Sequence, residues 1–461
     1  MSRVIMKTPG PKFAPFRQVR ARTLPRGARG TIPITSAPVL APLGSCWLRR
    51  ARPPLCSRPD VEFGGIAVSR ARVRSVAMAI GLLVSATSLL WVAPSASASP
   101  SAMTASTAKV DCVTVDPVTG SCQVPGVVYA ITQVGGTTYI GGSFKSVSGV
   151  PRQNVAAIRA DGSVDPSWNP STDGVVYALA ASADGSKVFL GGGFSTVGGE
   201  SRSRLAAASP DTGQLLSDWA ATAKNNVVRA LVADAGDRLY VGGSFSTFSG
   251  RNIARLAAVS QSTGGVDTSF APAPSATVRA LALSEDGTKL YAGGPFTTIG
   301  GASRPGAAEL SATSGVATSF APTEGGVVIS MDVTPSGRLF FGTTSNRTYA
   351  YDPAAGGAPV YRVRTSGDVQ AILATDDEVY IGGHFTSLPE AKLERAHVAS
   401  FQTDSGTATS WNPGANGSYG VWAIGLTRTA LSPDAVPALS IGGDFTRVAG
   451  AARRGYARFI F

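Results

Sequence analysis

Seven short apolar segments recur along the chain, and each begins with the phrase Val-x-Ala-Leu or a close variant of it. The second position of the phrase varies between aromatic, basic, amide and aliphatic residues, whereas the other positions stay apolar or small. Segments this short, bounded by turns such as Asp184-Gly185, are typical of β-strands in hairpins. The seven segments are 128–131, 176–179, 228–231, 278–281, 328–331, 369–372 and 421–424.

A second phrase, Gly-Gly-x-Phe, follows most of these segments and ends a second predicted strand. The steps between its first four Phe residues are 50, 51 and 51 positions, and residues 341–344 form a degenerate copy. Glycine pairs inside a strand indicate a bend or a close approach of another backbone. A third strand is predicted at segments such as Arg204–Ala207, and a fourth ends on a recurrent aromatic residue. The complete copies of Gly-Gly-x-Phe are 141–144, 191–194, 242–245, 293–296, 382–385 and 442–445; the aromatic residues are Trp168, Trp219, Phe270, Phe320 and Trp411.

Repetition near fifty residues, with four short strands in each unit, predicts an all-β fold: a seven-bladed β-propeller of four-stranded blades. The chain stops at Tyr456–Phe461, a third strand with no fourth after it. The segment Asp116–Cys122 resembles the turn that precedes a fourth strand. We therefore expect an N-terminal strand to complete the last blade, which would leave no free sheet edge at the joint. The recurrent Phe and Trp residues are expected to pack between neighbouring sheets.

The net charge of +12 does not describe the repeats. Residues 1–98 hold 15 Lys and Arg against 2 Asp and Glu, so the remaining 26 basic and 27 acidic residues leave a net charge of −1. The repeat region therefore has no basic field that would favour nucleic acid. The absence of His-rich, Cys-x-x-Cys and phosphate-loop patterns likewise gives no reason to expect a metal or another cofactor.

The basic excess precedes an apolar segment that is typical of an exported protein. Arg70, Arg72 and Arg74 stand before the apolar run 76–92, and Ala96-Ser97-Ala98 is a small-residue cleavage pattern. We expect 70–98 to be a cleaved Sec-type secretory signal, with an uncleaved membrane anchor as the alternative. Residues 1–69 are expected to be a disordered leader, or to lie before the true translation start, and 99–111 to be a linker to a propeller of residues 112–461.

Four cysteines divide in the same way. Cys46 and Cys56 lie in the leader, whereas Cys112 and Cys122 would remain in the exported protein, where disulfides persist. A bridge between the latter two is expected to be structural, with two unpaired thiols as the alternative. We expect a secreted or extracellular, monomeric protein that contacts no membrane once its signal is removed.

Two stretches resemble a known repeat family. The phrases Asp161–Pro170 and Val266–Pro272, together with the Gly-Gly-x-Phe-Thr stretches, resemble the bacterial delta-sixty repeat over about 112–461. That resemblance implies a β-propeller of a secreted or surface protein and brings no catalytic residue with it. Residues Tyr349–Asp352 resemble, more weakly, the quinoprotein type of propeller repeat.

The predicted ring suggests where a ligand would bind. Loops that join second to third strands and fourth to first strands would share one face, and the varying residues of the first strands would line the central channel. Packing between blades is the alternative role for many of these side chains. The candidate ligand-binding residues are Arg204, Arg255 and His397 on the face, and Tyr129, Tyr177, Arg229, Arg279 and Trp422 in the channel.

A binding or scaffolding module for an extracellular glycan or protein is the function that these features favour. No catalytic residue is assigned: His384 and His397, the only histidines, occupy positions that vary between repeats. An enzyme acting on extracellular polysaccharide is the alternative, and it would need paired carboxylates in the channel mouth. A quinone-dependent dehydrogenase is the third possibility, against which the missing cofactor motifs count.

Overall fold

The computed structural model describes residues 102–103, 109–111, 114–115, 122–124, 126–428 and 437–461. All of them belong to one compact unit of the chain, Leu89–Phe461. The predicted leader, the predicted signal 70–98 and Cys112 lie outside the described residues. Within the described ranges every element is a strand, and no helix is long and apolar enough to cross a membrane.

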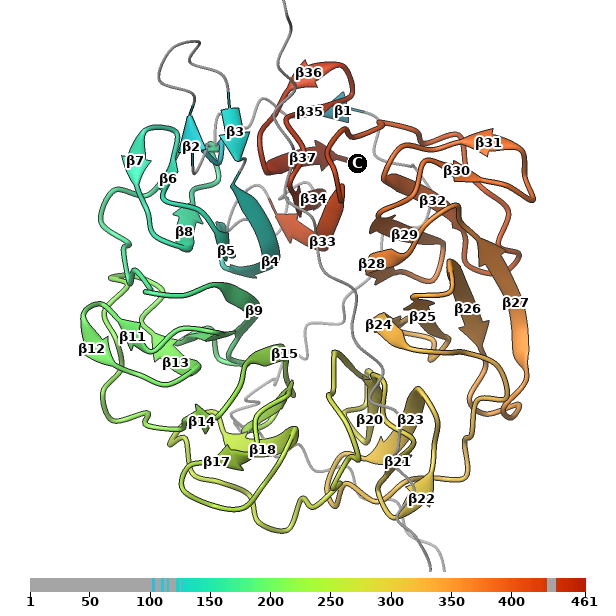
Figure 1. The fold of residues 1–461 in the computed structure, drawn as a ribbon, viewed down its shortest axis with the longest axis horizontal. Coiled ribbons are helices and arrows are strands. Elements are labelled where there is room, and N and C mark those ends of the chain that lie inside the picture. The colour runs from blue at the N-terminus through green and yellow to red at the C-terminus, as the bar shows by residue number, and fades with distance from the viewer. Residues whose placement is uncertain (1–101, 104–108, 112–113, 116–121, 125, 429–436) are drawn as a thin grey trace, which may run out of the picture. The chain divides into compact units, whose positions relative to one another are not determined.

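Seven antiparallel sheets of three or four strands make up the described part, and in each the second strand lies between the first and the third. Successive sheets are arranged around a common centre, with their first strands innermost (Figure 1). The predicted all-β architecture is therefore confirmed. The first strands are β4 (Val127–Val134), β9 (Val176–Ala181), β15 (Val228–Ala233), β19 (Ala280–Leu283), β24 (Val328–Val333), β28 (Val369–Ala374) and β33 (Val421–Arg428). The second strands are β5 (Thr137–Ser143), β10 (Val188–Gly192), β16 (Arg238–Gly243), β20 (Lys289–Gly293), β25 (Leu339–Thr343), β29 (Glu378–Gly383) and β34 (Pro437–Gly443). The third strands are β8 (Val155–Ile158), β13 (Leu205–Ala208), β18 (Leu256–Ser260), β23 (Ala307–Ser311), β26 (Arg347–Tyr351), β32 (Val398–Gln402) and β37 (Tyr456–Ile460).

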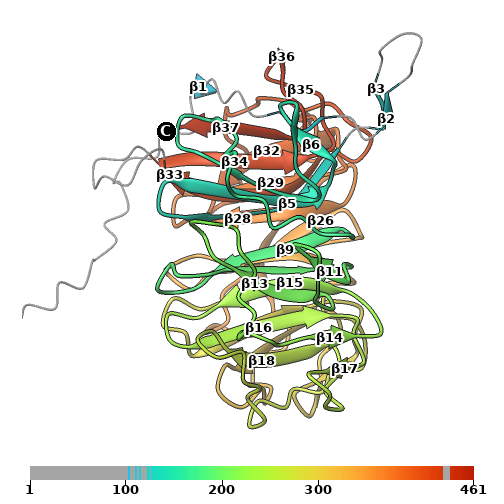
Figure 2. The same cartoon turned by 90° about the vertical axis from the view of Figure 1, so that its left-hand side faces the viewer.

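Fourth strands occur in only two of these sheets, where the sequence predicted one in all seven. They are β27 (Pro359–Arg364), beside β26 (Figure 1), and β1 (Ala102–Met103), beside β37 (Figure 2). β1 lies within 99–111, which was predicted to be a linker, whereas the closing strand was expected after the turn Asp116–Cys122. Elsewhere a single bridge, such as Ile158 with Val164, takes the place of a strand. In that sheet Asp165 ends the pairing, because its carboxylate accepts hydrogen bonds from Ser167 N and Oγ at 2.9 and 2.7 Å. This Asx turn directs the chain away from the sheet edge.

Small hairpins extend the connections between second and third strands. One of them joins Thr196 and Val197 to Glu200 and Ser201 through Gly198-Gly199, both of which have positive φ. These hairpins are β6–β7 (Ser146–Val147, Val150–Pro151), β11–β12 (Thr196–Val197, Glu200–Ser201), β21–β22 (Thr298–Ile299, Ala302–Ser303), β30–β31 (Ser387–Leu388, Leu393–Glu394) and β35–β36 (Arg447–Val448, Ala451–Ala452). Two further pairs are β14 (Ala223–Lys224) with β17 (Thr247–Phe248), and β2 (Thr114–Val115) with β3 (Cys122–Val124).

The hydrophobic core lies between successive sheets, and the glycine pairs explain how closely these sheets pack. A Cβ atom at Gly191, the first glycine of its pair, would lie 2.5 Å from Cγ1 of Val228 in the next sheet. The same relation joins Gly442 in the last sheet to Val128 in the first, again at 2.5 Å. Any side chain there would force two sheets apart, which accounts for the repeated glycine.

The recurrent aromatic residues also join neighbouring sheets, as predicted. Trp168 is fully buried and donates a hydrogen bond from Nε1 to the carbonyl oxygen of Ser209, 41 positions further along, at 2.9 Å. Trp219 donates in the same way to Ser260, at 3.1 Å. Because an indole ring buries a large apolar area while its N–H needs an acceptor, one residue supplies both packing and register between sheets.

Candidate functional site

The varying residue of the Val-x-Ala phrase occupies a β-bulge at the start of the first strand. In the third sheet, Val228 pairs with Gly243 and Ala230 with Gly242, so Arg229 has no residue opposite it. Five other first strands show the same shift in register, at the same place. A bulge bends the strand and redirects the extra side chain. In the fourth sheet the pairing begins at Ala280, opposite Gly293, and Arg279 directly precedes it without a bulge. We call the seven residues at this position of the phrase, six of which lie in a bulge, the bulge ring: Tyr129, Tyr177, Arg229, Arg279, Ile329, Gln370 and Trp422.

Three aromatic members of the bulge ring contact one another across three sheets. The ring centroids of Tyr129 and Tyr177 lie 5.5 Å apart, and those of Tyr129 and Trp422 lie 5.2 Å apart with planes at 82°. Tilted and edge-on pairs at this separation are favourable arrangements for aromatic rings. Burial, followed by the neighbouring Tyr177, raises the pKa of Tyr129, so its hydroxyl stays protonated at neutral pH. The three rings form a continuous, partly exposed aromatic arc.

Two arginines follow the aromatic arc around the bulge ring. The guanidinium carbon of Arg229 lies over the Tyr177 ring, 5.2 Å from its centroid. The Arg279 side chain is exposed, but neighbouring protein atoms partly desolvate its guanidinium; this desolvation, followed by the charge of Arg229, lowers the pKa of Arg279. Among the hydrogen bonds and ion pairs of the described residues, none involves either guanidinium. Within the described part of the chain, these two neighbouring positive charges therefore have no carboxylate partner.

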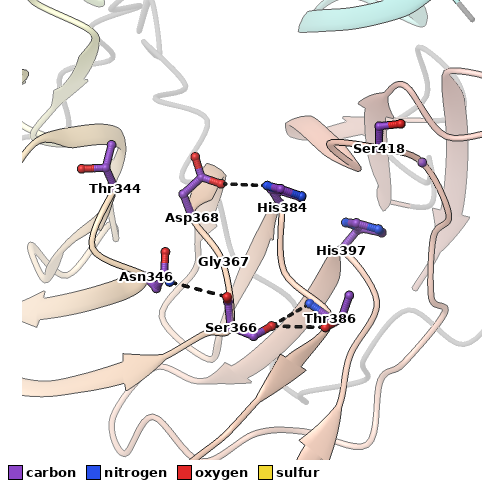
Figure 3. Close-up of a pocket in the computed structure, with 10 residues that line it drawn as sticks. Thr344, Asn346, Ser366, Gly367, Asp368, His384, Thr386, His397 and Ser418 are labelled. Carbon is purple, nitrogen blue, oxygen red and sulfur yellow. Dashed lines mark hydrogen bonds and ion pairs between the residues drawn. The ribbon is translucent and has the colours of Figure 1, made fainter. Parts of the chain in front are cut away.

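A polar pocket of about 630 Å³ opens near the aromatic end of the bulge ring (Figure 3). Its lining comes from loops that join second to third strands and from loops that precede first strands, on the face that the sequence predicted. Ser366 Oγ accepts a hydrogen bond from Thr386 N at 2.9 Å, and Asp368 Oδ1 lies 3.9 Å from His384 Nδ1. The lining residues are Thr344, Asn346, Ser366, Gly367, Asp368, His384, Thr386, His397, Gly417 and Ser418.

One buried carboxylate holds the loop that connects this pocket with the aromatic arc. Asp444 accepts hydrogen bonds from the backbone N–H groups of Ser418, Tyr419 and Gly420 at 3.1, 3.0 and 2.6 Å. The loop presents the Tyr419 ring, which is 55% exposed. That ring lies 6.1 Å from the ring of Trp422 and 5.5 Å from that of His384. The aromatic surface therefore continues from the bulge ring into the pocket.

The face residues predicted at the start of the third strands have different roles from one another. Arg204, Arg255 and His397 all have positive φ, between 63° and 69°. Arg204 and Arg255 donate hydrogen bonds to Ser203 Oγ and to the carbonyl oxygen of Pro274, at 2.8 and 3.1 Å, and so support nearby backbone. His397 lines the polar pocket, with Nδ1 3.0 Å from the carbonyl oxygen of Gly383 and its ring stacked on His384, 6.5 Å away.

The eight predicted site residues therefore divide into three sets. Tyr129, Tyr177, Arg229, Arg279 and Trp422 belong to the bulge ring, and His397 lines the polar pocket. Arg204 and Arg255 directly precede β13 and β18, in the sheets of Tyr177 and Arg229, and do not line the pocket.

Sequence reasoning missed three residues that shape this region. Asp368, Tyr419 and Asp444 each occur in one repeat only, so the period drew no attention to them. The signal that could have found Asp444 is an acidic residue in the variable position of Gly-Gly-x-Phe, where the other complete copies have Ser, Gly, Pro or His. In the described part of the chain, no group of three or more His, Cys, Asp or Glu side chains could hold a metal ion.

Comparison with known proteins supports the fold. The sequence profile of the family described as "Domain of unknown function (DUF5122) beta-propeller" matches residues 136–167. The WD40 β-propeller domain of Doa1 superposes with a TM-score of 0.51 over 77% of this chain and 96% of that one, at 10% identity. The chain contains a β-propeller domain. A structure of the mitotic checkpoint complex gives a TM-score of 0.51, with 15% identity, 76% of this chain and 89% of that one.

These likenesses concern the fold alone, because identities of 10% and 15% carry no information on ligands. No curated protein matches the sequence.

Proposed function

We propose that the domain is a seven-bladed propeller closed by its N-terminal strand. The proposal is supported by the pairing of β1 with β37, in which Ala102 lies opposite Ile460. It is also supported by a hydrogen bond that recurs between successive sheets. Thr172 N donates to the carbonyl oxygen of Gln153 at 3.1 Å, and Val110 N donates to that of Arg454 at 2.9 Å. Val110 therefore makes the same contact with the loop before the last sheet's third strand that Thr172 makes with the equivalent loop of the first sheet.

The repeat belongs, in this proposal, to the delta-sixty type. Support comes from the profile match over 136–167, which includes both Gly141–Phe144 and most of the phrase Asp161–Pro170. The protein is exported by the signal at 70–98 and acts outside the cell as a monomer, with a disulfide between Cys112 and Cys122. The charge asymmetry and the apolar run of the N-terminal part support that location.

The propeller functions as a module that binds an extracellular glycan or protein at its channel mouth, without catalysis. The channel mouth is the surface formed by the bulge ring, Tyr419 and the polar pocket. A single observation carries this proposal: the bulge ring has three aromatic, two basic, one amide and one aliphatic side chain, and no carboxylate. Hydrolysis of a glycosidic bond ordinarily needs two carboxyl groups that flank it. Exposed aromatic and arginine side chains, in contrast, are the residues that dominate binding energy at recognition surfaces.

Retention of cell-wall, polysaccharide and secreted-protein fractions by the immobilised protein tests this function. We expect saturable retention of one fraction, with no new soluble product, and a loss of at least about tenfold in affinity for Trp422→Ala. A second tryptophan cannot serve as the control, because Trp47 and Trp91 lie in the predicted leader and signal and Trp168→Ala would disturb packing between sheets. The control is therefore another aromatic residue away from the bulge ring: Tyr361→Phe keeps its ring packed between two sheets and should leave retention unchanged. Retention that is unchanged in Trp422→Ala would exclude the bulge ring as the binding site.

An enzyme acting on extracellular polysaccharide is the second candidate, and one observation favours it. The polar pocket places the carboxylate of Asp368 next to the His384 ring, at 3.9 Å, which is a possible acid–base pair. Release of reducing sugar from the retained fraction, and its loss in Asp368→Asn, would replace the binding function by this one.

A further inference from the structure

We infer that the channel mouth recognises an acidic polysaccharide, with carboxylate groups at Arg229 and Arg279 and sugar rings along the aromatic arc. This inference rests on the proposed binding function and specifies its ligand class.

The arginine pair provides the charge selectivity. Arg229 and Arg279 are adjacent members of the bulge ring, and both side chains are exposed. Several other arginines of the domain pair with carboxylates: Arg159 with Asp165, Arg238 with Asp267 and Arg362 with Glu324. The bulge-ring pair has none among the described residues, although the guanidinium groups repel each other. A bound carboxylate would relieve that repulsion and accept the free N–H groups of the planar guanidinium.

The charge is local and not a property of the whole domain. Beyond residue 98 the chain carries a net charge of −1. A general attraction for anions therefore does not arise from the repeats, and selectivity depends on the two arginines at the mouth.

The aromatic arc provides a path for several ring units beside the arginines. From Tyr177 the rings follow one another through Tyr129, Trp422 and Tyr419 to His384, and neighbouring centroids lie between 5.2 and 6.1 Å apart. Partly exposed aromatic faces bind the apolar faces of ring-shaped ligands, and the polar groups around them fix the orientation. The arginines stand at one end of this path and the polar pocket at the other.

The polar pocket distinguishes a polysaccharide from an acidic peptide. Every side chain that lines it is a hydroxyl, amide, carboxylate or imidazole group, and its remaining residues are glycines. It therefore offers donors and acceptors for hydroxyl groups, and none of its lining residues is a Val, Leu, Ile, Met or Phe that would hold the apolar side chains by which a peptide anchors. A chain of hydroxylated rings with carboxylate substituents complements all three parts of the surface.

Binding to polygalacturonate and to its fully methyl-esterified form tests the inference, because the two polymers share a backbone and differ in charge. Isothermal titration of the exported protein, which lacks the basic residues 1–98, should show saturable binding to polygalacturonate, weakened by added salt. The esterified polymer should bind at least about tenfold more weakly. Arg229→Gln/Arg279→Gln should lose that discrimination, whereas Lys224→Gln/Arg251→Gln, with the same change in charge on the outer hairpins, should keep it.

Other outcomes would overturn the inference and separate it from the proposed function. Equal affinity for both polymers, or discrimination that survives Arg229→Gln/Arg279→Gln, would refute the role of the arginines while leaving a glycan-binding module. Binding to poly-glutamate and to neither polymer would replace the polysaccharide by an acidic peptide. Failure to bind any of the three probes, together with Trp422-dependent retention of another fraction, would refute the ligand class and leave the proposed function standing.

Discussion

The close approach of neighbouring sheets predicts a specific cost for adding one carbon atom at Gly191. A Cβ there would lie 2.5 Å from Cγ1 of Val228 and 3.2 Å from Cδ1 of Leu231. Unstrained carbon atoms lie about 3.5–4.0 Å apart, so the sheets would have to separate by about 1 Å. Val228 is fully buried and β-branched, and it cannot rotate out of the way.

Overpacking of this kind costs about 1–3 kcal/mol, and replacing a strand glycine by alanine returns about 0.5–1 kcal/mol of backbone entropy. We therefore expect Gly191→Ala to lower the free energy of unfolding by about 1–2 kcal/mol. Urea denaturation followed by circular dichroism measures it as a lower midpoint with an unchanged slope.

Gly193 is the matched control, two positions further along the same segment. A Cβ atom there would meet Val227 Cγ1 at 3.4 Å and Tyr177 Cε2 at 3.8 Å, which are ordinary contacts. Gly193→Ala should leave the stability unchanged or raise it by about 0.4–1 kcal/mol. A Gly191→Ala variant as stable as the wild type would refute the packing argument, as would a Gly191→Ala/Val228→Ala double variant that shows no rescue relative to the sum of its parts.

Three further changes have defined consequences. Burial raises the pKa of Asp332 to about 6, so the folded protein holds a proton on this carboxyl group that the unfolded chain has already lost. The stability gained from that proton is lost as the pH rises from about 4 through 6. In urea denaturation, the wild-type protein should therefore lose on the order of 2 kcal/mol of unfolding free energy between pH 4 and pH 7 relative to Asp332→Asn, and parallel pH profiles of the two proteins would contradict this. Trp168→Phe should lose about 1 kcal/mol, because the carbonyl of Ser209 loses its indole donor; an unchanged thermal midpoint would refute it. Asp444→Ala should lower the free energy of unfolding by about 2–3 kcal/mol, because three backbone N–H groups lose their acceptor. It should also weaken retention of cell-wall material, because the loop no longer holds Tyr419 in place; full retention would show that Tyr419 does not contribute to binding.

The repeated contacts could be predicted from the sequence because each copy solves the same packing problem. Val228 and Gly191 meet across two sheets, and Val128 and Gly442 do the same, so the spacing of the two phrases gives the strands and their neighbours. The positions of the bulge ring could also be predicted from the period, because its members occupy the one varying position of a phrase that is repeated within this chain. Its five predicted members accordingly lie where the first strands begin.

Features without a period could not be predicted in this way. Five fourth strands are missing because local hydrogen bonds, such as those of Asp165 with Ser167, compete with the sheet edge, and hydrophobic patterning does not reveal that competition. Asp368 lines the polar pocket from the loop before β28, whereas Tyr419 and Asp444 lie on either side of the β33–β34 hairpin in the next repeat, so these residues meet only after folding. Arg204 and Arg255 were predicted to act with His397 because they share a position in the repeat. Because each repeat forms its own sheet, that shared position puts Arg204, Arg255 and His397 in three different sheets, each next to the loop of its own sheet.

Tryptophan fluorescence during titration with the retained cell-wall material tests the central claim most directly. Trp422 is partly exposed in the aromatic arc, whereas Trp168 and Trp219 are buried between sheets. We predict a saturable change in emission that disappears in Trp422→Phe, while that variant still retains the material because its ring still contacts Tyr129. An emission change that persists in Trp422→Phe, or retention without any change in the wild type, would contradict binding at the channel mouth.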